Sequence, residues 1–177
     1  MTIPLGGDGF ALRRATEADV DFLVELASHE EVEPFMAAVS PRDRDELLED
    51  VRRSEEDPRH HGRVVVEVKG KSVGSLAYSV ANRRSRIAHL HGIMLHPEHR
   101  GRGLGVAATE LLVRHLVFDL DYHRVQLEVY GFNERALALF ERAGFVREGV
   151  RRQAYDRHGG WVDGVLFGLV REDLEGR

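Results

Sequence analysis

The chain has no cysteine among its 177 residues. This absence excludes a disulfide framework, a thiolate nucleophile and a metal site built on cysteine. No apolar run approaches the length that crosses a membrane, and residues 1–9 lack both the basic and the apolar segment of a secretory signal. We therefore expect no membrane partner and a cytoplasmic location.

An excess of basic residues is also missing. The chain has 25 Lys and Arg against 30 Asp and Glu, and its formal net charge of −5 argues against a nucleic-acid partner. Hydrophobic residues make up 42% and charged residues 31%, which indicates a globular protein rather than a disordered one. The length suits one domain, residues 1–177, with a real hydrophobic core.

Apolar periodicity, together with glycine, proline and cap signals, divides the chain into eleven expected elements. A helix that joins two strands usually makes them parallel neighbours, so we expect one mixed sheet. The expected strands are 10–15, 63–69, 72–80, 86–95, 124–129, 145–155 and 161–170, and the expected helices are 16–27, 40–57, 103–119 and 133–143.

A basic, glycine-rich loop at 100–105 lies between the strand that ends at Leu95 and the helix that begins at Gly103. Glycine lets the backbone approach a ligand closely, and the first turn of a helix has unpaired N–H groups at the positive end of its dipole. Together these features predict an anion site suited to phosphate. A flexible helix entry without a ligand explains the same pattern. The glycine spacing fits neither the dinucleotide fingerprint nor a P-loop.

The run Arg100-x-x-Gly103-x-Gly105, after a strand and opening a helix, resembles the acetyl-CoA signature of the GNAT superfamily of N-acetyltransferases. Leu127-Glu128-Val129, Asn133 and the run 139–145 continue the resemblance downstream, in the order and spacing of the family. The resemblance covers about residues 9–171. The closing run, 149–169, is similar to the subgroup that contains ribosomal-protein alanine and polyamine N-acetyltransferases.

This resemblance implies a GNAT fold of the α+β class, which some schemes call three-layer α/β. The sheet would be mixed and seven-stranded, with about four helices and with the fourth and fifth strands splayed apart. Acetyl-CoA would be the cosubstrate, its pantetheine arm would lie in the gap, and no metal would be needed. A homodimer is a family-level expectation. The implied cofactor-binding residues are Ile93, Met94, Leu95, Arg100, Gly101, Arg102, Gly103, Leu104, Gly105, Val106, Asn133 and Phe140.

Acetyl transfer from a thioester to an amine needs a neutral amine, a stabilised oxyanion and a proton for the departing thiolate. An alkylammonium of pKa about 10.4 costs roughly 4–5 kcal/mol to deprotonate at pH 7. Glu128 occupies the position of the catalytic glutamate in the ribosomal-protein alanine N-acetyltransferases that the chain resembles, so it is our candidate base. A structural strand glutamate explains it equally well. A backbone N–H near Met94 or Leu95 is the candidate oxyanion donor.

The expected proton donor is missing. The relatives commonly have a tyrosine in the helix position filled here by Phe140, and a phenylalanine cannot donate a proton. Tyr155, Tyr130 and Tyr78 are candidate replacements, with Tyr155 first. Alternatively the thiolate, whose conjugate thiol has a pKa of about 8–9, leaves without help.

Two further groups of residues are open to a functional and a structural interpretation. His89 and His91 alternate onto one strand face and suggest a metal site or a base, but no acidic ligand is spaced to complete a metal set. Glu30, Glu31 and Glu33 could attract a cationic amine, although a solvated acidic loop explains them as well. We favour the structural interpretation for both groups and rank the histidines below Glu128 as bases.

These observations predict an acetyl-CoA-dependent N-acetyltransferase. Because no cysteine can form an acetyl-enzyme, we expect direct attack by the amine in a ternary complex. The acceptor would be a primary amine, on a small molecule or at a protein N-terminus. The alternative is a catalytically degenerate acyl-CoA sensor, which is suggested by Phe140 in place of the usual proton-donating tyrosine. A phosphate-binding regulator would explain the glycine loop alone.

Overall fold

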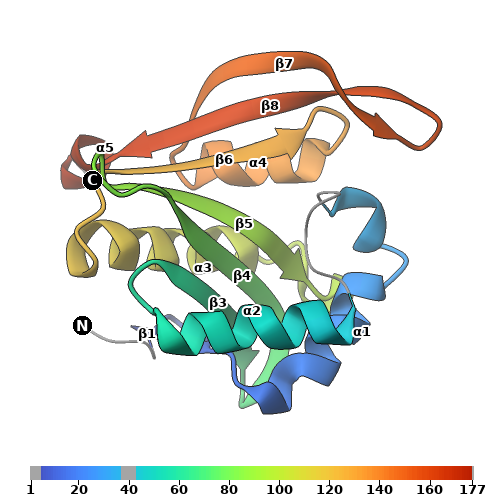
Figure 1. Ribbon diagram of the computed structural model, residues 1–177, viewed down its shortest axis with the longest axis vertical. Coiled ribbons are helices and arrows are strands. Elements are labelled where there is room, and N and C mark those ends of the chain that lie inside the picture. Colours follow the sequence, from blue (N-terminus) through green and yellow to red (C-terminus); the bar gives the residue numbers. More distant parts are fainter. Residues whose placement is uncertain (1–4, 37–42, 177) are drawn as a thin grey trace.

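The computed structural model describes residues 5–36 and 43–176, and within them eight strands form one mixed sheet (Figure 1). The strand order is β1-β2-β3-β4-β5-β6-β8-β7. Only β5 and β6 are parallel, and every other neighbouring pair is antiparallel. The strands are β1 (Leu5–Gly6), β2 (Ala11–Arg14), β3 (His61–Val68), β4 (Lys71–Asn82), β5 (Ile87–Leu95), β6 (Arg124–Tyr130), β7 (Val146–Arg157) and β8 (Gly160–Val170).

Five α-helices and several short helical turns accompany the sheet in the described residues. The α-helices are α1 (Val20–Ser28), α2 (Arg44–Glu56), α3 (Leu104–Arg114), α4 (Glu134–Arg142) and α5 (Arg171–Glu175). The turns are the 3₁₀ segments η1 (Glu17–Asp19), η2 (Glu33–Phe35) and η3 (Pro97–His99), and the π-helical segment η4 (His115–Asp119).

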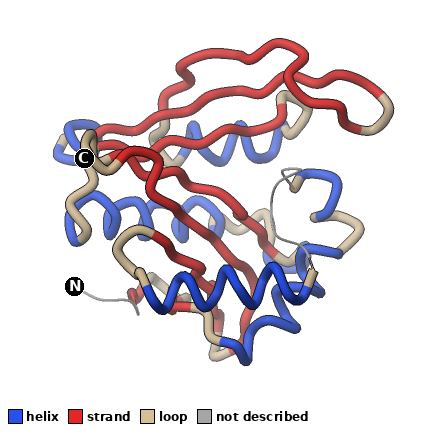
Figure 2. Tube along the Cα trace, in the orientation of Figure 1, coloured by secondary structure: helices blue, strands red, loops and turns tan. Residues whose placement is uncertain are grey.

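The helices form a layer on each face of the sheet, with α1 and α2 on one side and α3 and α4 on the other (Figures 1 and 2). Each layer packs on its own apolar core. The larger core joins α3 and α4 to the sheet, and the smaller joins α1 and α2 to Val65 and Met94. No helix within the described residues is long and apolar enough to cross a bilayer.

The predicted mixed sheet is confirmed, but the predicted number of strands was wrong. The sheet gains an eighth strand because Leu5, in β1, pairs with Leu12. The four predicted helices are present in the expected order as α1 to α4, whereas α5 was not predicted. The helix expected to reach residue 119 continues beyond Arg114 as the π-helical η4. The expected start of α2 at residues 40–42 lies outside the described residues. Asp43 caps that helix by accepting from the Glu46 N–H at 2.8 Å.

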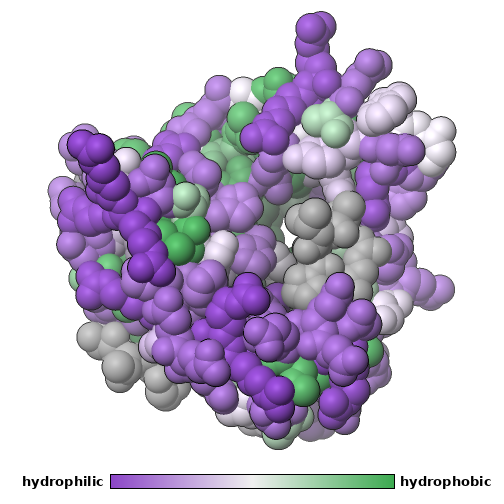
Figure 3. Space-filling model, in the orientation of Figure 1, coloured by the Kyte–Doolittle hydropathy of each residue, from purple (hydrophilic) through white to green (hydrophobic). Residues whose placement is uncertain are grey.

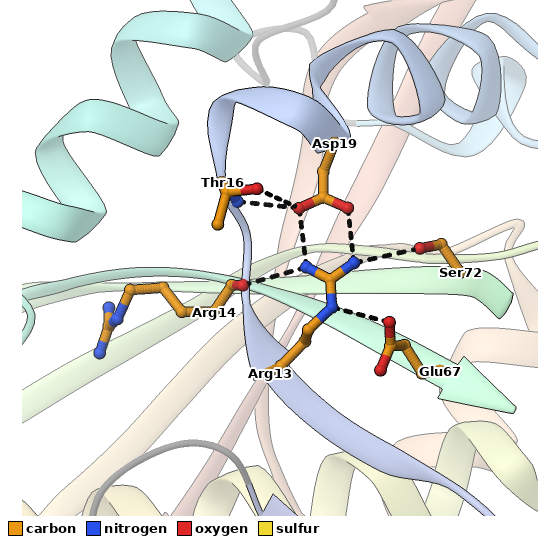
Figure 4. A network of polar contacts seen from close by, with 6 residues as sticks. All are labelled: Arg13, Arg14, Thr16, Asp19, Glu67 and Ser72. Carbon is orange, nitrogen blue, oxygen red and sulfur yellow. Dashed lines mark hydrogen bonds and ion pairs between the residues drawn. The ribbon is translucent and has the colours of Figure 1, made fainter. Parts of the chain in front are cut away.

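A half-buried ion network joins β2, η1 and β3 (Figure 4). The Arg13 guanidinium donates to both carboxylate oxygens of Asp19, at 2.7 and 2.6 Å, and to Glu67 at 2.7 Å. Thr16 donates to the Asp19 carboxylate from its backbone N–H and its hydroxyl. Burial alone would raise the pKa of Asp19, but the hydrogen bonds from Arg13 and Thr16 outweigh it and hold this pKa below its usual value.

We expect Asp19→Asn to lower the free energy of unfolding by about 3 kcal/mol at pH 7, because it leaves Arg13 without its main counter-charge. A carboxylate whose pKa is lowered in the folded state stabilises the protein above its unfolded pKa, near 4, and this contribution is lost as the pH falls. The difference from the parent protein should therefore shrink below about pH 4 in urea unfolding experiments.

Asp21→Asn is the matched control. Asp21 also pairs with an arginine, Arg44, at 3.2 Å, but its side chain is 85% exposed. Its loss should cost less than about 0.5 kcal/mol. Equal effects of the two variants would show that the Arg13 network adds no stability of its own.

Candidate active site

The candidate site is a cleft that opens where β5 and β6 part. These parallel strands pair over only three residues each, Ile87–His89 with Arg124–Gln126, and further along they are no longer joined. The cleft has a volume of about 890 Å³. It is lined by β5, β6, the 100–106 loop, α4, the segment 31–36 and Tyr155. Figure 3 shows the mostly hydrophilic face of the molecule hollowed beneath the β7–β8 hairpin.

The glycine loop forms one end of the cleft. Gly101 and Gly103 have φ angles of +78° and +79°, in the left-handed region where a side chain would be strained, and Gly103 is the N-cap residue of α3. The N–H groups of Leu104, Gly105 and Val106 lie in the first turn, where the helix supplies no acceptors. This end of the cleft therefore has the donors and the dipole of an anion site.

The end of β5 presents backbone groups to the gap. His96 donates its N–H to the Val73 carbonyl at 2.9 Å, and Met94 and Leu95 pair with Ser75 and Gly74. By the alternation of antiparallel pairing, the backbone of Met94 faces β4 and that of Leu95 faces away from it. In agreement, the Leu95 carbonyl accepts from Arg100 Nε at 2.9 Å.

The side chain of Arg100 joins two walls of the cleft. Besides the Leu95 carbonyl, it donates to the Glu31 carbonyl at 3.2 Å, and its Nη1 lies 3.9 Å from the Glu31 carboxylate. Arg100 therefore fastens the 31–36 segment to the end of β5. Glu31 lines the cleft and Glu30 is exposed, so the acidic segment lies at the mouth of the site.

The first residues of α4 complete the cofactor side. Asn133 caps α4, as expected, by accepting from the Ala136 N–H at 3.1 Å, and it lines the cleft. Phe140 is 3% exposed and packs its ring against Phe145 and Phe167 at centroid distances of 5.6 and 6.0 Å. Of the residues expected to bind the cofactor, all line the described cleft except Arg102 and Leu104.

Glu128 and Tyr155 lie together in the other part of the cleft. Oε1 of Glu128 is buried and has no hydrogen-bond partner among the described residues, while Oε2 lies 3.7 Å from Arg151. Burial raises the pKa of Tyr155, and the nearby Glu128 carboxylate raises it further. Tyr155 is therefore protonated at neutral pH and can donate a proton.

A missing side chain on β8 makes the space for this carboxylate. A Cβ atom placed on Gly164 would lie 2.0 Å from Glu128 Oε1 and 2.8 Å from the Tyr155 ring. Gly164 lies in the closing run 149–169, but it was not predicted to matter, because only strand pairing brings it beside Glu128.

The two other tyrosine candidates for the proton donor differ in their position relative to the cleft. Tyr130 lines the cleft and its ring lies edge-on to Tyr155 at 5.2 Å. Tyr78 is 1% exposed, donates its hydroxyl to the Pro58 carbonyl at 2.7 Å, and is outside the cleft lining. Tyr78 is therefore not placed to act in the cleft.

His89 and His91 form part of the cleft wall, with their rings stacked at a centroid distance of 5.9 Å. Burial lowers the pKa of His89, and burial followed by the charge of Arg63 lowers the pKa of His91 to about 4. Both imidazoles are thus neutral at pH 7. Arg63, which the sequence did not single out, is 1% exposed and donates to Asp50 at 2.7 Å. The described residues hold no group of three side chains arranged as metal ligands.

The comparisons with known proteins agree with this geometry. The model of the acetyltransferase (GNAT) family matches residues 22–145, more than half of the chain. The chain belongs to this family. The predicted GNAT fold and the predicted class of N-acetyltransferase are confirmed at the level of the family.

Several GNAT relatives are similar over much of the sequence. An SPbeta prophage-derived N-acetyltransferase of Bacillus subtilis is 29% identical over 63% of each chain, so the match spans less than two thirds of that relative. A spermidine N(1)-acetyltransferase of Vibrio cholerae is 25% identical over 78% of this chain and 79% of its own. A ribosomal protein bS18 alanine N-acetyltransferase of Salmonella typhimurium is 34% identical over 46% and 55%.

The solved structures show the same fold. A spermidine N-acetyltransferase chimera from Vibrio cholerae and hSSAT superimposes with a TM-score of 0.85 at 24% identity, covering 96% of this chain and all of that one. The predicted resemblance to the polyamine and ribosomal-protein subgroup is therefore confirmed.

We predict that an NMR titration will place the pKa of His91 near 4, below the usual 6.5, because its cation would be buried beside Arg63. A group whose pKa is lowered by folding takes up its proton more readily when unfolded, so the free energy of unfolding falls as the pH drops from about 6.5 to 4. His91→Gln should remove this part of the acid sensitivity. His123→Gln, at an exposed histidine, should retain it. A His91 titration near 6.5 would contradict the burial argument.

Proposed function

We propose that this GNAT chain is a cytoplasmic N-acetyltransferase that transfers the acetyl group of acetyl-CoA directly to a primary amine in a ternary complex. One observation carries the proposal: a single cleft joins the glycine loop and the start of α3 to Glu128 and Tyr155. An anion site and a carboxylate–phenol pair in one cleft are what a phosphate-bearing acyl donor and an amine acceptor require together.

The residues of the cleft fit acetyl-CoA. The start of α3 supplies N–H donors for a pyrophosphate, and the gap between β5 and β6 offers unpaired backbone groups to an amide-containing arm. We propose that the twelve residues expected from the sequence bind acetyl-CoA. The loop would contact it through backbone groups, and the Asn133 side chain would contact its pantetheine arm. Acetyl-CoA supplies an acetyl group already activated as a thioester.

The chain's own groups handle the protons and the developing charge. Glu128, whose side chain is 18% exposed, accepts the proton that the acceptor ammonium must lose before the neutral amine can attack. Tyr155 holds the proton that the departing sulfur needs, in place of the tyrosine absent at position 140. The N–H of Leu95 faces the gap, so it is better placed than that of Met94 to stabilise the carbonyl oxygen as it becomes negative.

The acceptor is proposed only as a primary amine, on a small molecule or at a protein N-terminus. The spermidine and ribosomal-protein acetyltransferases among the relatives both acetylate amines, which supports this class. The homodimer implied by the resemblance stays a prediction.

We expect Glu128→Gln to lower kcat about a hundredfold at pH 7, because general-base catalysis is lost. The deficit should shrink toward about pH 10, where an amine of pKa about 10.4 deprotonates without help. The KM for acetyl-CoA should not change. Thiol release from acetyl-CoA, measured over a panel of amines and short peptides, tests these points.

Glu49→Gln, on α2 with its side chain 65% exposed, is the control and should behave as the parent protein. An unchanged kcat in Glu128→Gln would remove Glu128 from the mechanism. Binding of acetyl-CoA in calorimetry with no thiol release for any amine would favour the acyl-CoA sensor, the function that Phe140 motivates.

Gly164→Ala tests the space beside Glu128. Its methyl group would overlap the end of the Glu128 side chain and the edge of the Tyr155 ring, so both side chains must move. The displaced carboxylate should lower kcat on the order of a hundredfold. Gly160→Ala, where a Cβ would meet no atom of the described residues within 4 Å, should retain full activity. Equal rates for the two variants would show that the position of the carboxylate is not critical.

A further inference from the structure

Four aromatic rings form a continuous row along the acceptor side of the cleft. Phe35 contacts Phe132 at a centroid distance of 5.8 Å, Phe132 stacks on Tyr130 at 5.4 Å, and Tyr130 meets Tyr155 edge-on at 5.2 Å. All four line the cleft. The row begins at Phe35, which is 43% exposed, and ends at Tyr155 beside Glu128.

The tip of the β7–β8 hairpin holds this row in place. Arg157 and His158 both donate to the Pro34 carbonyl, at 3.2 and 3.1 Å, so they tie the hairpin to the segment that carries Phe35. The Arg157 guanidinium lies over the Tyr130 ring at 5.4 Å, and the His158 ring lies edge-on to Phe132 at 5.5 Å. The row is thus a built wall from three segments far apart in the sequence.

The charges of the cleft do not suit a polycation. The described residues that line the whole cleft include three carboxylates and three guanidiniums, those of Glu31, Glu128 and Glu134 and those of Arg100, Arg135 and Arg142. Glu31 lies 3.9 Å from Arg100, and Glu128 lies 3.7 Å from Arg151. Beside the aromatic row, Arg151 already lies near the Glu128 carboxylate and the Arg157 guanidinium covers the Tyr130 ring, so a second or third ammonium group would meet guanidiniums there. One ammonium can approach the Glu128 carboxylate, whose side chain is 18% exposed.

From this wall and this charge balance we propose that the acceptor is a primary amine with a single positive charge and an aromatic body, and not a polyamine. The shared unit is an amino group two carbons from a phenyl ring. It occurs both in a free arylalkylamine and at the N-terminus of a peptide that begins with phenylalanine. The inference rests on the proposed acetyltransferase function and narrows its acceptor class.

The test compares four amines in the thiol-release assay with acetyl-CoA: phenethylamine, a short peptide amide beginning with Phe, ethylamine and spermidine. We expect kcat/KM for one of the two phenyl compounds to exceed that for ethylamine about tenfold or more, because packing against the aromatic row removes the phenyl ring from water. The better of the two identifies the source. Spermidine should be a poorer substrate than both.

Phe132→Ala separates the wall from the chemistry. We expect it to raise the KM for the preferred phenyl compound about tenfold and to change the KM for ethylamine much less, because ethylamine has no ring to lie against Phe132. Phe118→Ala is the control, because Phe118 is also exposed, at 40%, but lies on η4 outside the cleft lining. It should match the parent protein.

The inference is wrong if spermidine equals or exceeds the phenyl compounds in kcat/KM, or if Phe132→Ala affects ethylamine and the preferred phenyl compound equally. Calorimetry on the CoA-loaded protein separates the two proposals. Tighter binding of the phenyl compounds than of ethylamine, with no thiol released by any amine, would refute the acetyltransferase function and support the acceptor class. Equal binding of all four amines would refute the acceptor class.

Discussion

Hydrogen bonding between β5 and β6 stops after three residue pairs, and most of the site depends on that stop. A strand that loses its neighbour has N–H and C=O groups that need other partners, so the gap is a polar-edged groove inside an otherwise continuous sheet. The register shift in β5 opposite Leu76 accompanies the parting. Because β6 continues to pair with β8 along its whole length, Glu128 stays fixed while β5 turns away from it.

Arginine side chains join the walls of this groove. Arg100 connects the end of β5 to the segment before η2, and Arg157 connects the far hairpin to the same region at Pro34. A guanidinium suits this task because its several donors can satisfy carbonyl groups on separate segments. The segment 31–36, which forms one wall of the groove, is therefore held at Glu31 and at Pro34, although it contains little regular structure.

Local pattern was sufficient for most elements of the fold and for the glycine loop. The hairpin turns, the cap at Asn133 and the helix after Gly103 are set by residues adjacent in the chain, so their signals are visible in the sequence. β1 was missed because two residues are too few to show a period.

The aromatic row and the space at Gly164 were missed for a different reason. Phe35, Phe132 and Tyr155 come from three distant segments, and only the folded chain brings them into contact. Glu128 was found through a family motif, whereas its neighbour Arg151 follows from strand pairing alone.

Because Gly164 leaves the space that the Glu128 carboxylate occupies, the register between β6 and β8 determines the geometry of the active site. Tyr130 pairs with Gly164, and Glu128 pairs with Leu166. A slip of one residue would turn Asp163 or Val165 toward the carboxylate, because neighbouring positions on a strand alternate between faces. The tight turn between β7 and β8, where φ of Gly159 is +78°, sets a second alignment, which places Tyr155 of β7 opposite Val162 of β8. Insertions or deletions in that turn would therefore act on the active site by moving Tyr155, although the turn adds no residue to the described lining of the cleft.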